Sequence, residues 1–127
     1  MAKRNKAYES KPNDKKIEVN VKQISPLFQN VPAEKERFTD GLIYQLAVTI
    51  VLLERLVKEL NEGEVIEDFV QGSQRLRREN PALRSYNTTI KSFATLSKSL
   101  LDLLPEKTQK QAGEELMNFA LTPPRGD

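Results

Sequence analysis

The chain contains no cysteine, no histidine and no tryptophan. Without cysteine, a disulfide framework, a zinc–thiolate site and a thiol nucleophile are all excluded. Without histidine, the chain lacks the commonest metal ligand and the usual general base at neutral pH. Catalysis would have to rest on carboxylates, lysines or hydroxyls alone. The composition therefore argues against an enzyme, and we expect no cofactor and no metal.

Other absent features narrow the class of protein further. No stretch reaches the roughly 20 apolar residues of a membrane span, and the first residues lack an apolar run of the signal-peptide kind. The five glycines are scattered, and none precedes Lys-Ser or Lys-Thr as in a phosphate-binding loop. The carboxylate pairs Glu67-Asp68 and Glu114-Glu115 have no accompanying ligand pattern, which disfavours a metal or glycosidase site. We expect a cytoplasmic protein that does not bind ATP.

The charge is distributed unevenly over what is, at 127 residues, one domain's length. The net charge is +2, but residues 1–16 alone carry six basic and two acidic side chains. This segment has little apolar surface to bury, so we predict a disordered basic arm over residues 1–16. Its cations could neutralise DNA phosphates, or the arm could be a solubilising tail. The basic residues of the arm are Lys3, Arg4, Lys6, Lys11, Lys15 and Lys16.

The first half of the folded region contains a short alternating segment and one long apolar pattern. Ile17, Val19 and Val21 alternate with polar residues, which predicts a short strand. Apolar residues then recur at three- and four-residue steps from Asp40 to Asn61, as one helix face requires, and Gly63 is a natural stop. Asp40 is expected to cap this helix. Whether one helix runs from Pro32 or a break falls near Gly41 stays open.

Residues 46–53 are apolar nearly all the way round the first long helix. One explanation is a central helix covered on two sides by its own chain. The other is that part of this segment faces another subunit, since a small domain has little material to wrap a helix completely. The residues of that predicted oligomer interface are Val48, Val51 and Leu52.

The second half is again helical, after a connection with β-prone segments. Residues 65–70 and the turn-like Gln71-Gly72-Ser73 indicate a small β-hairpin. Asn80 is a good N-cap and Pro81 fits a first helical turn, so a second long helix is predicted from Pro81 to about Leu104. Pro105 ends it, and a final helix is expected over residues 106–120.

These elements define the expected architecture. Two long helices joined by about 15 to 20 residues are expected to pack antiparallel. We predict a mainly α protein: a central antiparallel helical hairpin with a small β-hairpin or loop at the connection, an extra C-terminal helix and the disordered basic N-terminal arm. Residues 17–121 would form a single helical oligomerising domain and residues 122–127 a C-terminal tail.

Two groups of cations in the second half have alternative roles. Arg75, Arg77 and Arg78 could contact a DNA backbone, because the guanidinium fork suits phosphate. Equally, they could pair with the acidic residues at 62, 64, 67 and 68, either across the hairpin or from a neighbouring subunit. Arg84, Lys91 and Lys98 recur at sevens on the second helix, which is either a solvated face or a basic stripe lining a ring channel.

The order of these features resembles a known family. Thr39-Asp40 precedes the first long helix, a turn falls at Gly63, Asn-Pro-Ala-Leu (80–83) opens the second helix, and Leu-Asp-Leu-Leu-Pro (101–105) closes it. Over residues 38–108 the chain resembles the small subunit of a tailed-phage DNA-packaging terminase, of the type built on a central helical hairpin. The ending Leu-Thr-Pro-Pro-Arg (121–125) is similar to the family's Leu-Thr-Pro ending, although residues 103–107 already occupy the position directly after the second helix.

The resemblance implies a function that the composition alone does not. Members of this family are non-enzymatic subunits that recognise viral double-stranded DNA and deliver it to the large ATPase–nuclease subunit for genome packaging. They are usually homo-oligomeric rings. The alternative, from another class, is a helical structural or adaptor protein that binds a protein partner through the apolar face of its first long helix.

Overall fold

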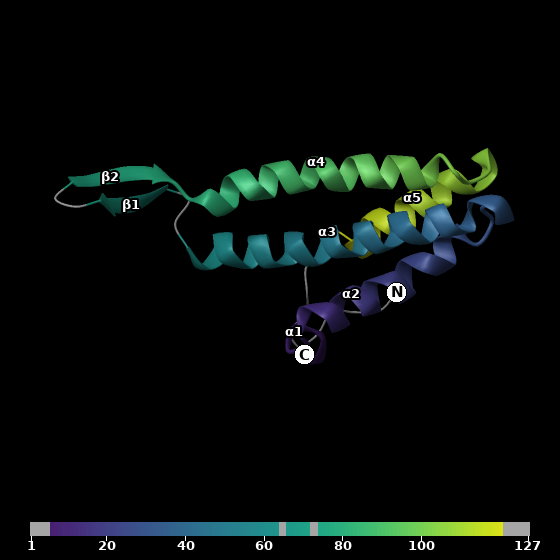
Figure 1. Ribbon diagram of the computed structural model, residues 1–127, viewed down its shortest axis with the longest axis horizontal. Helices are drawn as coiled ribbons and strands as arrows, with labels where there is room; N and C mark the ends of the chain where they lie inside the picture. The colour runs from purple at the N-terminus through teal and green to yellow at the C-terminus, as the bar shows by residue number, and fades with distance from the viewer. Residues whose placement is uncertain (1–5, 64–65, 72–73, 121–127) are drawn as a thin grey trace.

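The computed structural model describes residues 6–63, 66–71 and 74–120, and it is mainly helical, as the sequence predicts. Figure 1 shows two long helices side by side, running in opposite directions, with two strands extending past one end of the pair. The elements in chain order are α1 (Lys6–Glu9), α2 (Asn13–Ile24), the 3₁₀ turns η1 (Ser25–Phe28) and η2 (Ala33–Lys35), α3 (Glu36–Glu62), β1 (Ile66–Gln71), β2 (Gln74–Glu79), α4 (Pro81–Leu101) and α5 (Glu106–Ala120).

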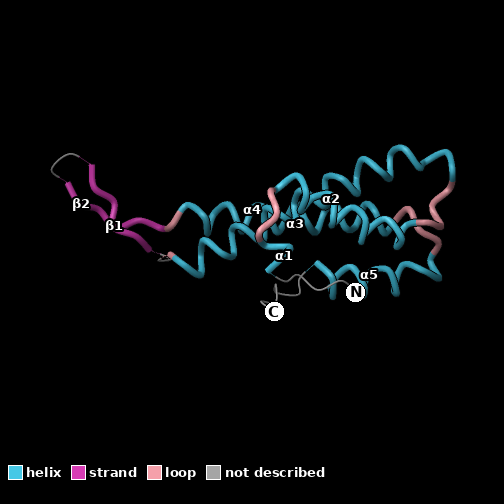
Figure 2. The backbone as a smooth tube through the Cα atoms, turned by 90° about the horizontal axis from the view of Figure 1, so that it is seen from below, coloured by secondary structure: helices cyan, strands magenta, loops and turns pink. Residues whose placement is uncertain are grey.

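The hydrophobic core lies toward the end of the α3–α4 pair that is remote from the strands. There α2 packs against α3, and α5 packs against both α4 and η1. Among the described residues, no buried member of the core cluster falls between Leu53 and Phe93. The strand-bearing end of the long helices therefore depends chiefly on α3–α4 contact, and Figure 2 shows the strands projecting beyond the helical body. The buried members of the cluster are Ile24, Phe28, Ile43, Leu46, Ala47, Ile50, Leu53, Phe93, Leu100, Leu104, Ala112 and Leu116.

The predicted strand over residues 17–21 is wrong, because this segment lies within α2. Ile17, Val21, Ile24 and Phe28 are spaced by four, three and four residues, which places them along one helix face. That face packs into the core, where Ile24 is fully buried and Phe28 is 5% exposed. A lone strand would have had no partner to satisfy its backbone groups, whereas the helix satisfies them internally.

The prediction of a disordered arm over residues 1–16 is also wrong for the residues that the structure describes. Residues 6–9 form α1 and α2 begins at Asn13. Tyr8 is only 6% exposed. One buried aromatic ring is therefore enough to anchor this segment, although its composition offers little other apolar surface. Lys3 and Arg4 lie outside the described residues.

The first long helix begins earlier than the Asp40 cap would require. After η2, α3 runs without interruption from Glu36 to Glu62, and Gly41 lies inside it. The prediction that Asp40 caps the helix is wrong, because Asp40 lies in the second turn and its side chain is exposed. At the other end Gly63 follows the helix, as predicted, and its amide donates to the Glu59 carbonyl at 2.9 Å.

The second long helix starts where the capping signal predicts. The Asn80 side chain accepts a hydrogen bond from the Ala82 amide at 2.9 Å, and Pro81 occupies the first helical position. The helix ends at Leu101, a little before the predicted Leu104, which is buried in the following turn. The predicted bounds of the last helix, 106–120, are confirmed. Residues 121–127, which include the predicted tail, lie outside the described residues.

Candidate nucleic-acid interface

The burial of Tyr8 holds on the helical body the segment that carries Lys6, Lys11, Lys15 and Lys16. The Tyr8 hydroxyl donates to Glu54 Oε1 of α3 at 2.6 Å and accepts from Asn20 Nδ2 of α2 at 2.9 Å. Asn20 is fully buried and also donates to the Lys16 carbonyl at 2.8 Å. The Tyr8 hydroxyl thus links α1, α2 and α3. The lysines of α1 and α2 therefore lie on packed helices.

The N-terminal lysines are already partly engaged within the chain. Lys15 Nζ lies 3.5 Å from a Glu18 carboxylate oxygen, and Lys16 Nζ lies 5.6 Å from the centre of the Tyr8 ring. Lys6 and Lys11 are exposed. Both side chains of the Lys15–Glu18 pair are more than half exposed, and an ion pair at such a position contributes little to stability.

The strand register places acidic positions opposite two of the three predicted DNA-binding arginines. β1 and β2 pair antiparallel, with Arg77 opposite Asp68 and Arg78 opposite Glu67, whereas Arg75 is opposite Val70. The two strands together hold three acidic and three basic residues, so their charges balance. Pairing of Arg77 and Arg78 across the strands and their contact with DNA both stay predictions.

The two groups of cations singled out for DNA binding are not brought together. The strands lie beyond one end of the α3–α4 pair, whereas α1 and α2 lie beside the body of α3 (Figure 1). Figure 2 shows the same separation from below. The N-terminal lysines and the strand arginines therefore do not form one continuous patch.

The outward face of α4 carries a third group of cations. Arg84, Lys91 and Lys98 are all exposed and are spaced by seven residues, about 10 Å along the helix axis. This face points away from the core, since Thr89, Phe93 and Leu100 are buried on the opposite side.

No acidic residue interrupts this row. The sequence from Asn80 to Leu101 contains neither aspartate nor glutamate. The exposed positions between the cations include Thr88 and Thr95, whose side chains are small and polar. Lys98 Nζ forms an ion pair with Asp102 at 3.0 Å, just past the end of the helix. Within the described part of the chain, Arg84 and Lys91 form no ion pair.

In the sequence, the cations of α4 follow directly on the arginines of β2. Residues 74–101 hold six basic side chains and one acidic side chain, Glu79. We define the α4 basic face by its three cations, Arg84, Lys91 and Lys98. Sequence reasoning noted the seven-residue spacing but missed the signal that strengthens it, the absence of any carboxylate between Glu79 and Asp102.

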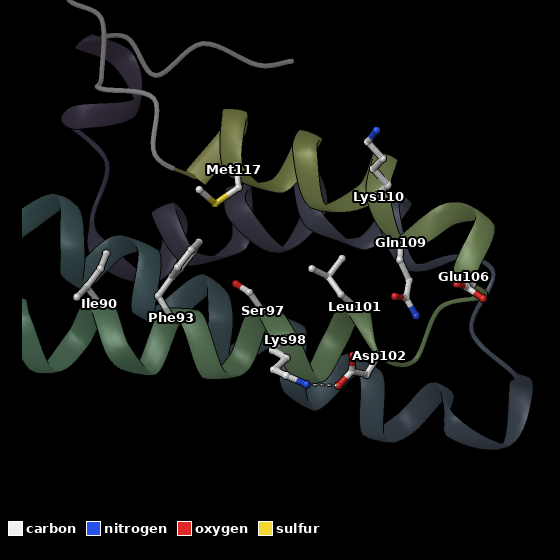
Figure 3. Close-up of a pocket in the computed structure, with 11 residues that line it drawn as sticks. Ile90, Phe93, Ser97, Lys98, Leu101, Asp102, Glu106, Gln109, Lys110 and Met117 are labelled. Atoms are coloured by element: carbon white, nitrogen blue, oxygen red, sulfur yellow. Dashed lines mark hydrogen bonds and ion pairs between the residues drawn. The ribbon is translucent and has the colours of Figure 1, made fainter.

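An open groove lies between α4 and α5, and its walls are largely apolar. Figure 3 shows the Phe93 and Met117 side chains on facing walls, with the Lys98–Asp102 ion pair at the rim. Met117 is 53% exposed. The polar side chains of the groove are scattered along its edge, so this recess suits an apolar side chain rather than a reacting substrate.

The three residues of the predicted oligomer interface differ in exposure. Leu52 is 44% exposed and Val48 is half-buried. Val51 is only 4% exposed, so its placement in a subunit interface is wrong. It lies on the side of α3 that its own chain covers, which is the first of the two explanations offered by the sequence.

Comparison with known proteins adds no relative. No family model, no curated protein and no solved structure matches the chain. The resemblance to terminase small subunits thus rests on the sequence features of residues 38–108 and stays a prediction. Among the described residues, no helix is long and apolar enough to cross a membrane.

Proposed function

We propose that this chain is a non-enzymatic DNA-binding subunit of a phage terminase. It would bind viral double-stranded DNA and deliver it to a large ATPase–nuclease subunit, and it would work as a homo-oligomer, with a ring as the form that the family resemblance implies. The observation that carries the DNA-binding part is the α4 basic face, three exposed cations on a helix without a carboxylate.

The chemistry of this face favours backbone contact over base reading. Arginine and lysine on phosphate oxygens fix the position of a protein on DNA but carry no sequence information. The exposed threonines between the cations are also side chains that bind phosphate oxygens. We therefore expect the α4 basic face to supply affinity and register, with the strand arginines adding to it where they are not paired.

The test is a charge variant of the α4 basic face, measured by fluorescence anisotropy on a short duplex. The variant Arg84→Gln, Lys91→Gln, Lys98→Gln removes three exposed cations, and Lys58→Gln, Lys107→Gln, Lys110→Gln is a control with the same net charge. We expect the first variant to lose at least about tenfold in affinity. Its slope of log affinity against log salt should fall by about 0.9 for each phosphate that the variant no longer neutralises. Equal losses in both triple variants would overturn this assignment.

The other predicted DNA-binding residues need separate variants. Removing residues 1–16 would also remove Tyr8 and disturb the packing of α2 on α3, so glutamine at Lys6, Lys11 and Lys15 is the cleaner change. Glutamine at Arg75, Arg77 and Arg78 tests the strands. Each triple variant isolates one surface, since the two groups lie apart on the molecule.

The second candidate function is a helical adaptor for another protein. The observation that favours it is the set of large apolar side chains exposed on α3, Phe38, Tyr44 and Leu52. A stable monomer that leaves titrated duplex unbound would support the adaptor. A larger particle that binds duplex would support the terminase subunit.

A further inference from the structure

We propose that two copies of this chain pack α3 against α3, antiparallel, about a two-fold axis at Val48. The contact deepens the proposed function by naming one surface for self-association. It closes at two copies, so it does not by itself form a ring, and it does not depend on DNA binding. Its starting observation is a face of α3 that the rest of the described chain leaves open. The residues of this α3 face are Arg37, Gly41, Tyr44, Val48, Leu52, Arg55 and Glu59.

The α3 face is apolar at its middle although it is exposed. Tyr44 is 51% and Leu52 44% exposed, and Val48 between them is half-buried. The opposite side of the same helix carries Leu46 and Ile50 in the core. Exposed apolar side chains clustered on one helix face, rather than scattered singly, mark a protein-binding surface.

A single register brings complementary residues together over the whole length of the face. At about 3.6 residues per turn, steps of four, seven and eleven residues from Val48 each return to within about 40° of its direction. In an antiparallel pair centred on Val48, residues equally far from it on the two copies face each other. Tyr44 lies four residues before Val48 and Leu52 four residues after it. Tyr44 of one copy therefore meets Leu52 of the other.

The same register pairs opposite charges at the ends of the face. Arg37 lies eleven residues before Val48 and Glu59 eleven residues after it. Both side chains are exposed, and within the described part of the chain neither forms an ion pair. The two-fold axis generates this Arg37–Glu59 pair twice. A parallel arrangement would instead place Arg37 against Arg37, which is repulsive.

Gly41 supports the same register. A Cβ built on Gly41 would meet no atom within 4 Å, so nothing in the described chain requires a glycine at this position of α3. Seven residues on the other side of Val48 stands Arg55, a long exposed side chain. In the antiparallel pair Arg55 of the second copy lies over Gly41, where the missing side chain leaves room for it.

The absence of cysteine makes the contact directly testable by cross-linking. Val48→Cys places a thiol at the two-fold axis, so mild oxidation of the full chain at micromolar concentration should give disulfide-linked dimers. Val57→Cys is the matched control, because it changes the same residue type on the same helix. Val57 lies nine residues from Val48, so its side chain points in the opposite direction from the helix axis. It is 40% exposed. Equal cross-linking of the two variants would overturn the proposal.

Two further variants test the direction of the helices. Tyr44→Cys mixed with Leu52→Cys should cross-link as a mixed dimer, more than either variant does with itself, and a preference for self-linked dimers would contradict the antiparallel register. Arg37→Glu and Glu59→Arg should each lower the dimer fraction in sedimentation velocity, and combining them should restore it. Simple addition of the two losses would count against the pairing.

These experiments contain no DNA, so their failure is distinct from a failure of the proposed function. A cross-linked dimer that does not bind duplex would contradict DNA binding and leave the α3 contact standing. A strictly monomeric chain that binds duplex would overturn the α3 contact and the homo-oligomer, and would leave DNA binding standing. Binding of another protein to this face without any self-association would also overturn it and support the adaptor.

Discussion

At the scale of single residues, Asn80 controls the join between the strands and α4. Its side chain is 7% exposed and accepts from the Ala82 amide, one of the four amides at a helix start that have no partner within the helix. Asn80→Ala removes this acceptor, and we expect it to lower the free energy of unfolding by about 1 kcal/mol. Asn87→Ala, an exposed position inside the same helix, is the control and should change little. Urea unfolding of both variants measures the difference, and equal midpoints would contradict the capping role.

The surroundings of Gly41 and Gly63 predict opposite effects of a Gly→Ala substitution on stability. Gly41 lies inside α3 with open space around it, so Gly41→Ala should stabilise the monomer by up to about 1 kcal/mol through helix propensity. At Gly63 a Cβ would lie 3.0 Å from the Glu59 carbonyl oxygen, and Gly63→Ala should therefore destabilise the chain. Thermal unfolding in dilute solution, where self-association is minimal, checks both signs. Shifts in the same direction would contradict this account.

At the scale of elements, α1 and α2 depend on a hydroxyl that bridges them to α3. Tyr8→Phe keeps the ring but removes the oxygen that bonds to Glu54 and Asn20, which should lower the free energy of unfolding by about 1–3 kcal/mol. Hydrogen exchange should rise across α2 more than across α4. Tyr44→Phe is the matched control, since that side chain is 51% exposed. Unchanged exchange in α2 would show that the hydroxyl does not hold the segment.

The same elements show the limits of local pattern. Alternating apolar residues at 17, 19 and 21 predicted a strand, yet the segment is a helix because Ile24 and Phe28 extend a four-residue spacing into the core. Within α4, spacing correctly aligned Arg84, Lys91 and Lys98 on one exposed face. The residues of a helix face can be predicted from the spacing within one helix. A strand also needs a second strand to pair with, and a local sequence pattern does not reveal whether one is present.

At the scale of the whole molecule, the strands are peripheral to the core. A Cβ on Gly63 would lie 3.2 Å from Asn80 Nδ2, so the two ends of the connection are adjacent. Replacing residues 64–79 by a four-residue Gly/Ser linker should leave a helical body that still unfolds cooperatively, measured by circular dichroism. DNA affinity and its salt dependence should fall no further than in the variant with glutamine at Arg75, Arg77 and Arg78. Loss of cooperative unfolding would show that the strands support the core.

The sequence by itself determined the helical class, the stop at Gly63, the start at Asn80-Pro81 and the bounds of α5. These features depend on hydrogen bonds and ring geometry within about four residues, so local sequence is sufficient to specify them. Only the tertiary structure decided that residues 6–16 are not a free arm and that Val51 is covered while Leu52 is not. Those outcomes depend on contacts such as that between Tyr8 and Glu54, 46 residues apart, which folding creates and no local pattern contains.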